Sequence, residues 1–489
     1  MEFGKLNKIL GDRLTSLMTV LKQWTEAPPE SRNFKHFEEQ IRVETIKIEQ
    51  AALAEGLAAL DVDFDQIEVD GHCFRKMEGK RTATYCTLAG EISVERSLYR
   101  PDGKGRPICP LDLRAGVIEG CWTPRAAEVM AYSVALMTPY EAEEFIPKFG
   151  GLAPSRSSLD RLPKALSKRW EESRTAWEDA IRSTEVVPTA AGIVVASMDG
   201  VTVPMKDGER KEKREKALAE GKQTRGPAGY REAACGVVSI YSDHQERLQT
   251  TYCARMPESK KVTLQEQITN ETSAVLAAVP CPILVLTSDG APDNWRILEG
   301  MENSLRDEGV LKKDDAVYKI ADFYHASQHL KRATDLFYGE NSPASYGAHE
   351  ELRRILRDED AGVSIVVKRL TYFRNQSEGR KRDQLSTKLE YFRSRTVLMN
   401  YAEFQRLGLP IGTGVTEAAC KTLVTQRMKR SGMRWGNPGG QAVLTLRSLL
   451  QSGRWQSGWE QLSKSYVTPV TKVTVNRNLP CSDAEKVAA

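Results

Sequence analysis

The first 60 positions of the chain carry hydrophobic side chains at three- and four-residue spacing, as at Leu6, Leu10, Leu14 and Leu17. An α-helix brings such positions onto one face, so residues 1–60 are predicted to form an N-terminal helical region. Its apolar face either packs into a core or makes dimer contacts. The pattern is compatible with both roles.

A strand pattern follows the helical one. Apolar and polar residues alternate over 84–88 and again over 91–99, on either side of the turn dipeptide Ala89-Gly90. A period of two predicts β-strands, and two strands joined by a short glycine turn form a hairpin. Residues 61–121 are therefore predicted to form a small β-rich domain.

Residues 122–185 return to a helical pattern with a break in the middle. A helix is expected over 139–149, then a Gly150-Gly151 turn, then a second helix that begins near Ser155. Two short helices with a glycine turn are typical of the helix-turn-helix, although helical proteins of many kinds contain such pairs. A helix-turn-helix-like DNA-binding region is predicted here.

Cations on the second of these helices are the candidate DNA contacts. Arg156 and Arg161 lie near its start, where they could meet phosphates or base edges. Pro163 is expected to interrupt this helix, because proline lacks the N–H that a helix interior uses.

The clearest α/β pattern lies in residues 186–325. Apolar runs that predict strands alternate with helical stretches in the order β-β-β-α-β-α-β, which is that of an RNase H-like core. The expected strands are 192–198, 232–241, 246–254, 283–287 and 316–320, and the expected helices are 262–279 and 294–305.

Three other segments surround this core. Residues 326–409 are largely helical and are predicted to be an insertion, after which the core resumes at 410–465. The charged run 206–222 is expected to be a solvated helix or loop, with a DNA-contacting arm as the alternative. Residues 466–489 are predicted to be a flexible tail. The predicted fold class is an α/β RNase H-like catalytic core with a helical insertion, preceded by helical and small β-rich N-terminal domains.

Length, net charge and cysteine content limit the classes of protein to which the chain can belong. A chain of 489 residues is long enough for about three domains, and its net charge of +4 permits a nucleic-acid partner only through local basic patches. Its nine cysteines include no C-x-x-C pair, which favours reduced thiols over a structural zinc site. With no apparent signal peptide and no run long enough to span a bilayer, a cytoplasmic location is predicted.

Three carboxylates carry the candidate chemistry. Asp199 and Asp289 each follow an apolar strand run, and Glu417 opens a basic helix. Two acids at adjacent strand ends and a third on a helix could hold a pair of divalent metal ions for phosphoryl transfer. Asp-Gly pairs are also common turn signals, but their recurrence after two strands of one core favours a functional role. Asp293 remains a rival ligand.

Two histidines, His325 and His329, stand one helical turn apart and could share zinc. The glutamate of the H-E-x-x-H metalloprotease motif is missing between them, so peptidase chemistry is poorly supported. The preferred interpretation is a helix cap at Asp322, with the histidines packed near the active site.

A basic segment follows Glu417 and is a candidate for phosphate binding. Such contacts position DNA without specifying its sequence, and a solvated helix end is the alternative. The candidate contacts are Lys421, Arg427, Arg430, Arg434 and, as a stacking surface, Trp435.

Three motifs in this order resemble D-D-E transposases of bacterial insertion sequences: Thr287-Ser288-Asp289-Gly290, Asp322-x-x-His325 and Gly412-Thr413-Gly414-Val415-Thr416-Glu417. The chain looks most like the ISKra and ISLre groups, relatives of the Mutator-like enzymes, over residues 80–465. Their RNase H-like core carries a C/D-x-x-H motif and a helical insertion before the last glutamate.

The resemblance implies a site and a reaction. Asp199, Asp289 and Glu417 would be the catalytic metal ligands, His325 would support the active site, and the cofactor would be two Mg²⁺ ions that Mn²⁺ can replace. The partners would be transposon-end DNA and target DNA, bound by a homodimer or higher oligomer in the bacterial nucleoid. The implied reaction is cleavage of transposon ends and joining of the 3′-OH to target DNA. A simple RNase H-like nuclease and a domesticated, inactive DNA-binding or regulatory protein are the alternatives.

Overall fold

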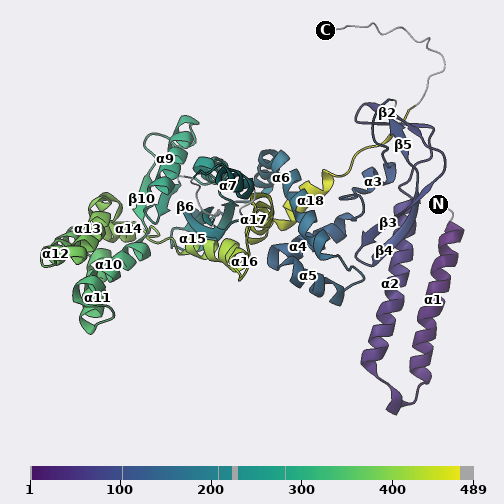
Figure 1. Cartoon of the computed structure of the whole chain (residues 1–489), viewed down its shortest axis with the longest axis horizontal. Coiled ribbons are helices and arrows are strands. Elements are labelled where there is room, and N and C mark those ends of the chain that lie inside the picture. The colour runs from purple at the N-terminus through teal and green to yellow at the C-terminus, as the bar shows by residue number, and fades with distance from the viewer. Residues whose placement is uncertain (1–2, 102, 207–208, 223–228, 281, 474–489) are drawn as a thin grey trace, which may run out of the picture. The chain divides into compact units, whose positions relative to one another are not determined.

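The computed structural model describes residues 3–101, 103–206, 209–222, 229–280 and 282–473. The chain divides into two compact units, one made of residues 1–165 with 459–489 and the other of residues 166–458. Figure 1 labels the helices and strands of both. Within the described residues, no helix is both long enough and apolar enough to cross a bilayer.

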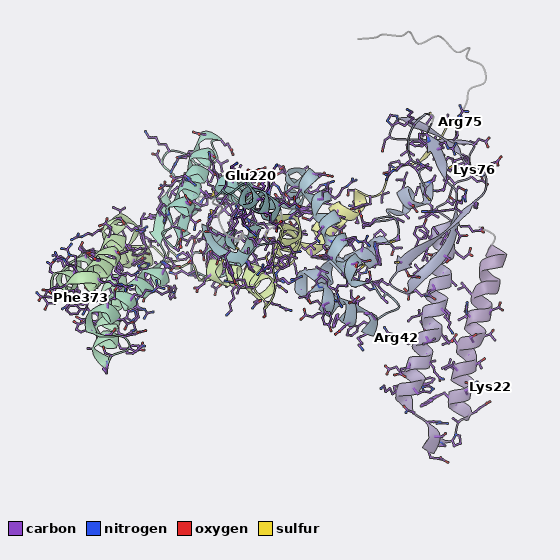
Figure 2. The ribbon with its side chains drawn as sticks, in the orientation of Figure 1. Lys22, Arg42, Arg75, Lys76, Glu220 and Phe373 are labelled. Carbon is purple, nitrogen blue, oxygen red and sulfur yellow. The ribbon has the colours of Figure 1, made fainter. Side chains whose placement is uncertain are left out.

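The first unit begins with two long helices, α1 (Phe3–Glu26) and α2 (Phe34–Ala58), which pack as a hairpin. The rings of Trp24 and Phe37 stack near its turn, with 4.4 Å between their centroids. Exposed side chains such as Lys22, labelled in Figure 2, cover much of the hairpin. The helices predicted for the first 60 residues are confirmed.

Two small sheets come next. Strands β3 and β4 pair antiparallel, so the predicted hairpin is confirmed, and its turn uses Gly90 at a φ of 102° that favours glycine. The other sheet has the order β11-β1-β2-β5. The strands are β1 (Gln66–Val69), β2 (His72–Lys76), β3 (Arg81–Thr87), β4 (Gly90–Arg96), β5 (Tyr99–Pro101) and β11 (Thr471–Lys472).

Strand β11 corrects part of the tail prediction. Its residues, expected to be flexible, pair antiparallel with Ile67 and Glu68 of β1. Backbone hydrogen bonds to a strand edge hold this stretch without any apolar pattern in its sequence, which is why the pattern did not reveal it. The remainder of the predicted tail, residues 474–489, lies outside the described residues.

Pro163 does not interrupt its helix, so that prediction is wrong. Helix α6 runs from Arg156 to Thr184 with the proline inside it. The proline costs about 3 kcal/mol. Burial of Leu159 and Leu162 beside it returns about 1.5 to 3 kcal/mol each, enough to keep the helix continuous. The preceding helices are α3 (Pro110–Ala115), α4 (Pro124–Leu136) and α5 (Pro139–Phe145).

The second unit is built on a mixed five-stranded sheet. Strands β6, β7 and β8 form an antiparallel meander, and β9 and β10 add parallel to β6, which gives the order β10-β9-β6-β7-β8. The predicted order of elements is confirmed. They are β6 (Ala191–Pro204), α7 (Glu209–Ala219), β7 (Tyr230–Ser242), β8 (Arg247–Arg255), α8 (Val262–Ala278), β9 (Ile283–Ser288), α9 (Pro292–Asp307) and β10 (Val317–Ala321). Helix α7 occupies the charged run and is largely exposed where its side chains are described.

Both faces of the central strand are buried. Val194 and Met198 of β6 pack in one cluster with α8 and α9, whereas Ile193 and Val195 pack in another with the helices of the insertion. A strand covered on both faces has a near-continuous apolar sequence, which is why the run ending at Met198 was recognisable.

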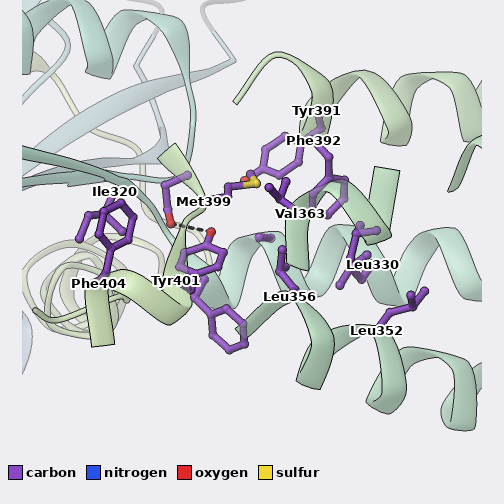
Figure 3. Close-up of a cluster of buried hydrophobic side chains, with 14 of the residues drawn as sticks. Ile320, Leu330, Leu352, Leu356, Val363, Tyr391, Phe392, Met399, Tyr401 and Phe404 are labelled. Carbon is purple, nitrogen blue, oxygen red and sulfur yellow. Dashed lines mark hydrogen bonds between the residues drawn. The ribbon is translucent and has the colours of Figure 1, made fainter. Parts of the chain in front are cut away.

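The insertion is helical, as predicted, and shares a core with the sheet. In the buried cluster of Figure 3, Phe404 packs beside Ile320, and the hydroxyl of Tyr401 donates to the carbonyl of Ala321 at 2.8 Å. The helices are α10 (Phe323–Tyr338), α11 (Pro343–Asp358), α12 (Gly362–Asn375), α13 (Gly379–Arg393) and α14 (Tyr401–Arg406).

The chain returns to the sheet through a helix that changes type. A π-helical turn, η5 (Cys420–Thr425), separates α15 (Gly414–Ala419) from α16 (Gln426–Met428). Arg447 donates to the carbonyl of Leu423 at 3.0 Å and also to that of Thr422. Two carbonyls of the irregular turn are thereby hydrogen-bonded. The last helices are α17 (Asn437–Gln451) and α18 (Trp455–Lys464).

Candidate active site

Asp199 and Asp289 occupy equivalent places on neighbouring parallel strands. The pairing of β6 with β9 ends at Met198 and Ser288, and an aspartate follows each of these residues. Both aspartates line one cleft of about 480 Å³. The sequence predicts this proximity, but Asp199 does not end its strand: β6 continues to Pro204, because its other edge stays paired with β7.

The two carboxylates repel one another in a partly buried setting. Burial raises the pKa of Asp199 above its ordinary value, and the charge of Asp289 raises it further. Asp289 is held by the start of α9, where its Oδ1 accepts hydrogen bonds from the N–H of Ala291 at 3.0 Å and the Nδ2 of Asn294 at 3.4 Å. A divalent cation would relieve this repulsion, and hard carboxylate oxygens are the ligands that Mg²⁺ prefers.

Glu417 lies in the first turn of α15 and is exposed. The hydroxyl of its neighbour Thr416 hydrogen-bonds that of Ser197, two residues before Asp199 on β6. Helix α15 is therefore anchored to the strand that carries Asp199. The three predicted ligands are not gathered, however: among the described residues, no group of three or more His, Cys, Asp or Glu side chains could hold a metal ion.

Asp322 fixes the start of two segments. Its Oδ1 caps α10 by accepting from the N–H groups of Tyr324 at 2.7 Å and His325 at 3.3 Å, so the predicted helix cap is confirmed. Its Oδ2 accepts from the N–H of Thr413 at 3.2 Å and from the Thr413 hydroxyl. Since Thr413 directly precedes α15, this buried carboxylate ties the segment of Glu417 to the end of β10.

The two histidines are connected to the loop of Asp289 through the side chain of Tyr391. The Nε2 atoms of His325 and His329 are 3.3 Å apart, and His329 stacks on Tyr391 with 3.9 Å between ring centroids. The hydroxyl of Tyr391 donates to the carbonyl of Asp289 at 3.4 Å. Burial and nearby cations lower the pKa of His329 to about 3, so its ring is neutral near pH 7.

The loop after β9 is also held from the insertion. Arg395, just beyond α13, donates to the carbonyl of Gly290 at 2.6 Å. Gly290 has a φ of 97°, and a Cβ there would lie 2.7 Å from the Nε of Arg395, so this position requires glycine. Nothing in the sequence pattern linked Tyr391 or Arg395 to the site, because they lie 102 and 105 residues from their partners in the loop, a separation with no periodic signal.

Three further polar residues of the cleft escaped sequence reasoning. Glu232 of β7 lies against Gly200, where an added Cβ would stand 2.3 Å from its Oε1. Lys261 donates to Glu232 at 2.6 Å and to Asn294 at 2.9 Å. An acid, an amide and an ammonium group thus form a chain that runs from Gly200 to Asp289. The sequence offered one weak signal for Asn294, which follows Asp289 at the start of a predicted helix, where negative charge is stabilised.

The basic segment after Glu417 is exposed only in part. Lys421, Arg430 and Arg434 lie at the surface, but Arg427 is 1% exposed and faces the ring of Trp435 at 5.4 Å. This burial contradicts the prediction that Arg427 contacts DNA. The cause is the π-helical turn, which adds a residue and rotates the following side chains by about 100° relative to a regular helix.

Trp435 is half-buried and has a structural role. Its indole N–H donates to the carbonyl of Met428 at 2.8 Å, and its backbone N–H donates to the carbonyl of Pro204 at 2.9 Å. The ring is thus held between α16 and the end of β6, with one face covered by Arg427. A base could stack on Trp435 only at the face that Arg427 leaves uncovered, so its role as a stacking surface stays a prediction.

The predicted DNA-reading cations lie in the first unit. The guanidinium group of Arg156 interacts with residues of the same unit: it donates to Glu143 at 2.8 and 3.0 Å and lies 4.7 Å from the ring centroid of Tyr140. Arg161 is exposed, with its Nε donating to the carbonyl of Ser157 at 3.3 Å. Arg161 is therefore the better placed of the two for a phosphate.

No protein-family model matches the chain, and no curated protein matches it. Among solved structures it is similar to a Drosophila P element transposase strand transfer complex, with 11% identity over 69% of this chain and 80% of that chain and a TM-score of 0.24. A TM-score this low does not establish a shared fold, and no individual insertion-sequence group is supported.

Proposed function

We propose that the chain is a D-D-E transposase with an RNase H-like core, which cleaves DNA and joins the released 3′-OH to a target. The single observation that carries this proposal is the placement of Asp199 and Asp289, one residue beyond the last pair of two parallel strands and in one cleft. The sheet order supports it, since an antiparallel meander followed by two parallel strands has its first and fourth strands side by side.

The donors fit a hard divalent metal ion. Asp199 and Asp289 would hold it, with Asn294 orienting Asp289 and the N–H of Gly200 orienting Asp199. A bound Mg²⁺ pair would stabilise the attacking and leaving oxygens of an in-line phosphoryl transfer. Glu417 would complete the ligand set by a rearrangement of its side chain or helix when DNA binds, while the contact of Thr416 with Ser197 keeps α15 on the sheet.

The exposed cations after Glu417 would bind the DNA backbone. These cations are Lys421, Arg430 and Arg434, which follow Glu417 along the chain and are exposed. They would contact phosphates without reading bases. The substrates would be transposon ends and target DNA, and the two chemical steps would share one geometry: water attacks first, and the 3′-hydroxyl attacks second.

Neutralising the ligands tests the proposal. Asp199→Asn, Asp289→Asn and Glu417→Gln should each abolish Mg²⁺-dependent cleavage and leave duplex binding nearly intact, because each removes a metal-binding charge and little volume. Asp293→Asn is the matched control, since Asp293 lines the same cleft but pairs with Arg296 at 3.1 Å. Full cleavage by Asp289→Asn, or equal loss in Asp293→Asn, would contradict this assignment.

A joining assay separates the transposase from a hydrolytic nuclease. Supplying a pre-cut end with a free 3′-OH and a target plasmid should yield a covalent product with the wild type. Release of cleaved ends without joining would instead identify a nuclease. A protein that binds DNA but performs neither step would fit the exposed, ungathered position of Glu417 and identify an inactive, domesticated protein.

A further inference from the structure

A lysine that no sequence motif marks projects into the cleft of the two aspartates. Lys261 lines this cleft together with Asp199, Asp289 and Glu232, and its side chain is 17% exposed. We propose that Lys261 is a phosphate-binding residue, which contacts a phosphate group of the nucleic acid beside the carboxylate pair. This inference rests on the proposed function and adds to it a cationic residue outside the D-D-E set.

The position of the ammonium group is well defined. Its Nζ donates to the Oε1 of Glu232 at 2.6 Å and to the Oδ1 of Asn294 at 2.9 Å. The Nδ2 of Asn294 in turn donates to the Oδ1 of Asp289 at 3.4 Å. A single amide therefore separates the lysine from a proposed metal ligand, which places a fixed cation next to the position of a phosphate beside that carboxylate.

The present partner of Lys261 is one that it can exchange. Glu232 has a side chain that is 47% exposed, and ion pairs with such exposed partners contribute little to stability. A phosphate entering the cleft must pass the carboxylates Asp199, Glu232 and Asp289, so it needs a cation there. The cations among the cleft-lining residues are Lys261 and the exposed Arg231.

The backbone at this point is strained. Lys260 and Lys261 have φ values of 55° and 54°, in the left-handed region that glycine adopts freely and lysine rarely does. Two consecutive residues in this conformation place the lysine at the N-terminus of the 17-residue helix α8, where backbone N–H groups favour an anion. Strained residues tend to persist at functional sites, which is consistent with this role.

The strain provides a matched pair of variants. Lys261→Gly removes the side chain and relieves the backbone, so it should not lower the melting temperature. Lys260→Gly relieves the neighbouring residue in the same way but removes an exposed side chain that does not line the cleft. Lys261→Arg keeps the charge and serves as the rescue. All three are made in the full chain and compared with wild type.

Two readouts follow these variants. Binding of a labelled random-sequence duplex is measured without metal at several salt concentrations, and Mg²⁺-dependent cleavage is measured on a supercoiled plasmid. Lys261→Gly should weaken binding about 10-fold, lower the slope of log affinity against log salt by about 1, and reduce kcat/KM about 10- to 100-fold. Lys260→Gly should match wild type in both assays, and Lys261→Arg should recover most of the loss.

The outcomes separate this inference from the proposed function. If wild type binds duplex and Lys261→Gly binds and cleaves like Lys260→Gly, Lys261 does not bind phosphate, and the proposed function stands. If wild type binds without cleaving, the binding and salt data alone decide for or against Lys261. A wild type that neither binds nor cleaves overturns the proposed function and this inference together.

Discussion

Replacing Thr413 with valine tests whether one carboxylate holds the segment that carries Glu417. Thr413 donates both its N–H and its hydroxyl to Asp322, a buried residue at the end of β10. Valine has nearly the same shape and keeps the N–H, so the substitution removes the hydroxyl contact alone. Because Asp322 keeps three backbone partners, from Tyr324, His325 and residue 413, its cap on α10 should survive.

The magnitude follows from the chemistry of the lost bond. A hydrogen bond to a buried carboxylate contributes about 1.5 to 3 kcal/mol, and one between neutral groups contributes about 0.5 to 1.5 kcal/mol. Thr416→Val removes the neutral hydroxyl contact with Ser197 on the same segment and is therefore the comparison. Thr413→Val should destabilise the segment more than Thr416→Val does, and both should reduce cleavage, since both hold α15.

Amide hydrogen exchange measured by peptide is the suitable assay. Unfolding by urea would combine two compact units that need not unfold together. The peptide covering residues 413–420 should exchange about 10- to 150-fold faster in Thr413→Val, whereas the capped start of α10, residues 323–330, and the β3–β4 hairpin of the other unit should exchange as in the wild type. Unchanged exchange in the 413–420 peptide, or a smaller effect than that of Thr416→Val, would refute the reasoning.

Two further predictions concern DNA contacts and pH. The double variant Lys421→Gln, Arg434→Gln should weaken binding to every duplex alike and lower the salt slope by about 2, whereas a loss confined to one sequence would indicate base reading. The pKa of His329 is lowered from its ordinary 6.5 to about 3, so its contribution to stability is complete above pH 6.5 and is lost as the pH falls towards 3. His329→Phe can keep the stack on Tyr391 and should flatten the fall of melting temperature over this range; an unchanged profile would assign the acid sensitivity to other groups.

The sequence revealed the sheet because burial leaves a signature. Strands covered on both faces are apolar nearly throughout, and β6 and β9 were recognisable for that reason, whereas the edge strands β8 and β10 are only partly buried. Asp199 and Asp289 were predictable because each interrupts such a run with a charge. The ends of the strands were harder to predict. Strand β6 extends beyond Asp199 because it stays paired with β7, and the local sequence does not reveal a neighbouring strand.

The rest of the site depends on contacts that no local pattern records. Three elements supply the other polar residues of the cleft, and only the fold brings them together: β7 carries Glu232, the N-terminus of α8 carries Lys261 and the start of α9 carries Asn294. Arg427 was misassigned for a different reason. Helical spacing assumes 3.6 residues per turn, and the π-helical turn before Arg427 breaks that phase, so a cation expected at the surface points inward.

The insertion has a role that its sequence does not disclose. As a run of helices between β10 and Glu417, it could be an appendage that the core merely tolerates. Instead, Tyr391 and Arg395 donate to the backbone carbonyls of Asp289 and Gly290, so the loop that carries one proposed metal ligand is held by the insertion. The same tyrosine carries the stacked His329. The geometry of Asp289 is therefore set jointly by the sheet, which fixes where β9 ends, and by the insertion, which fixes how the chain turns after it.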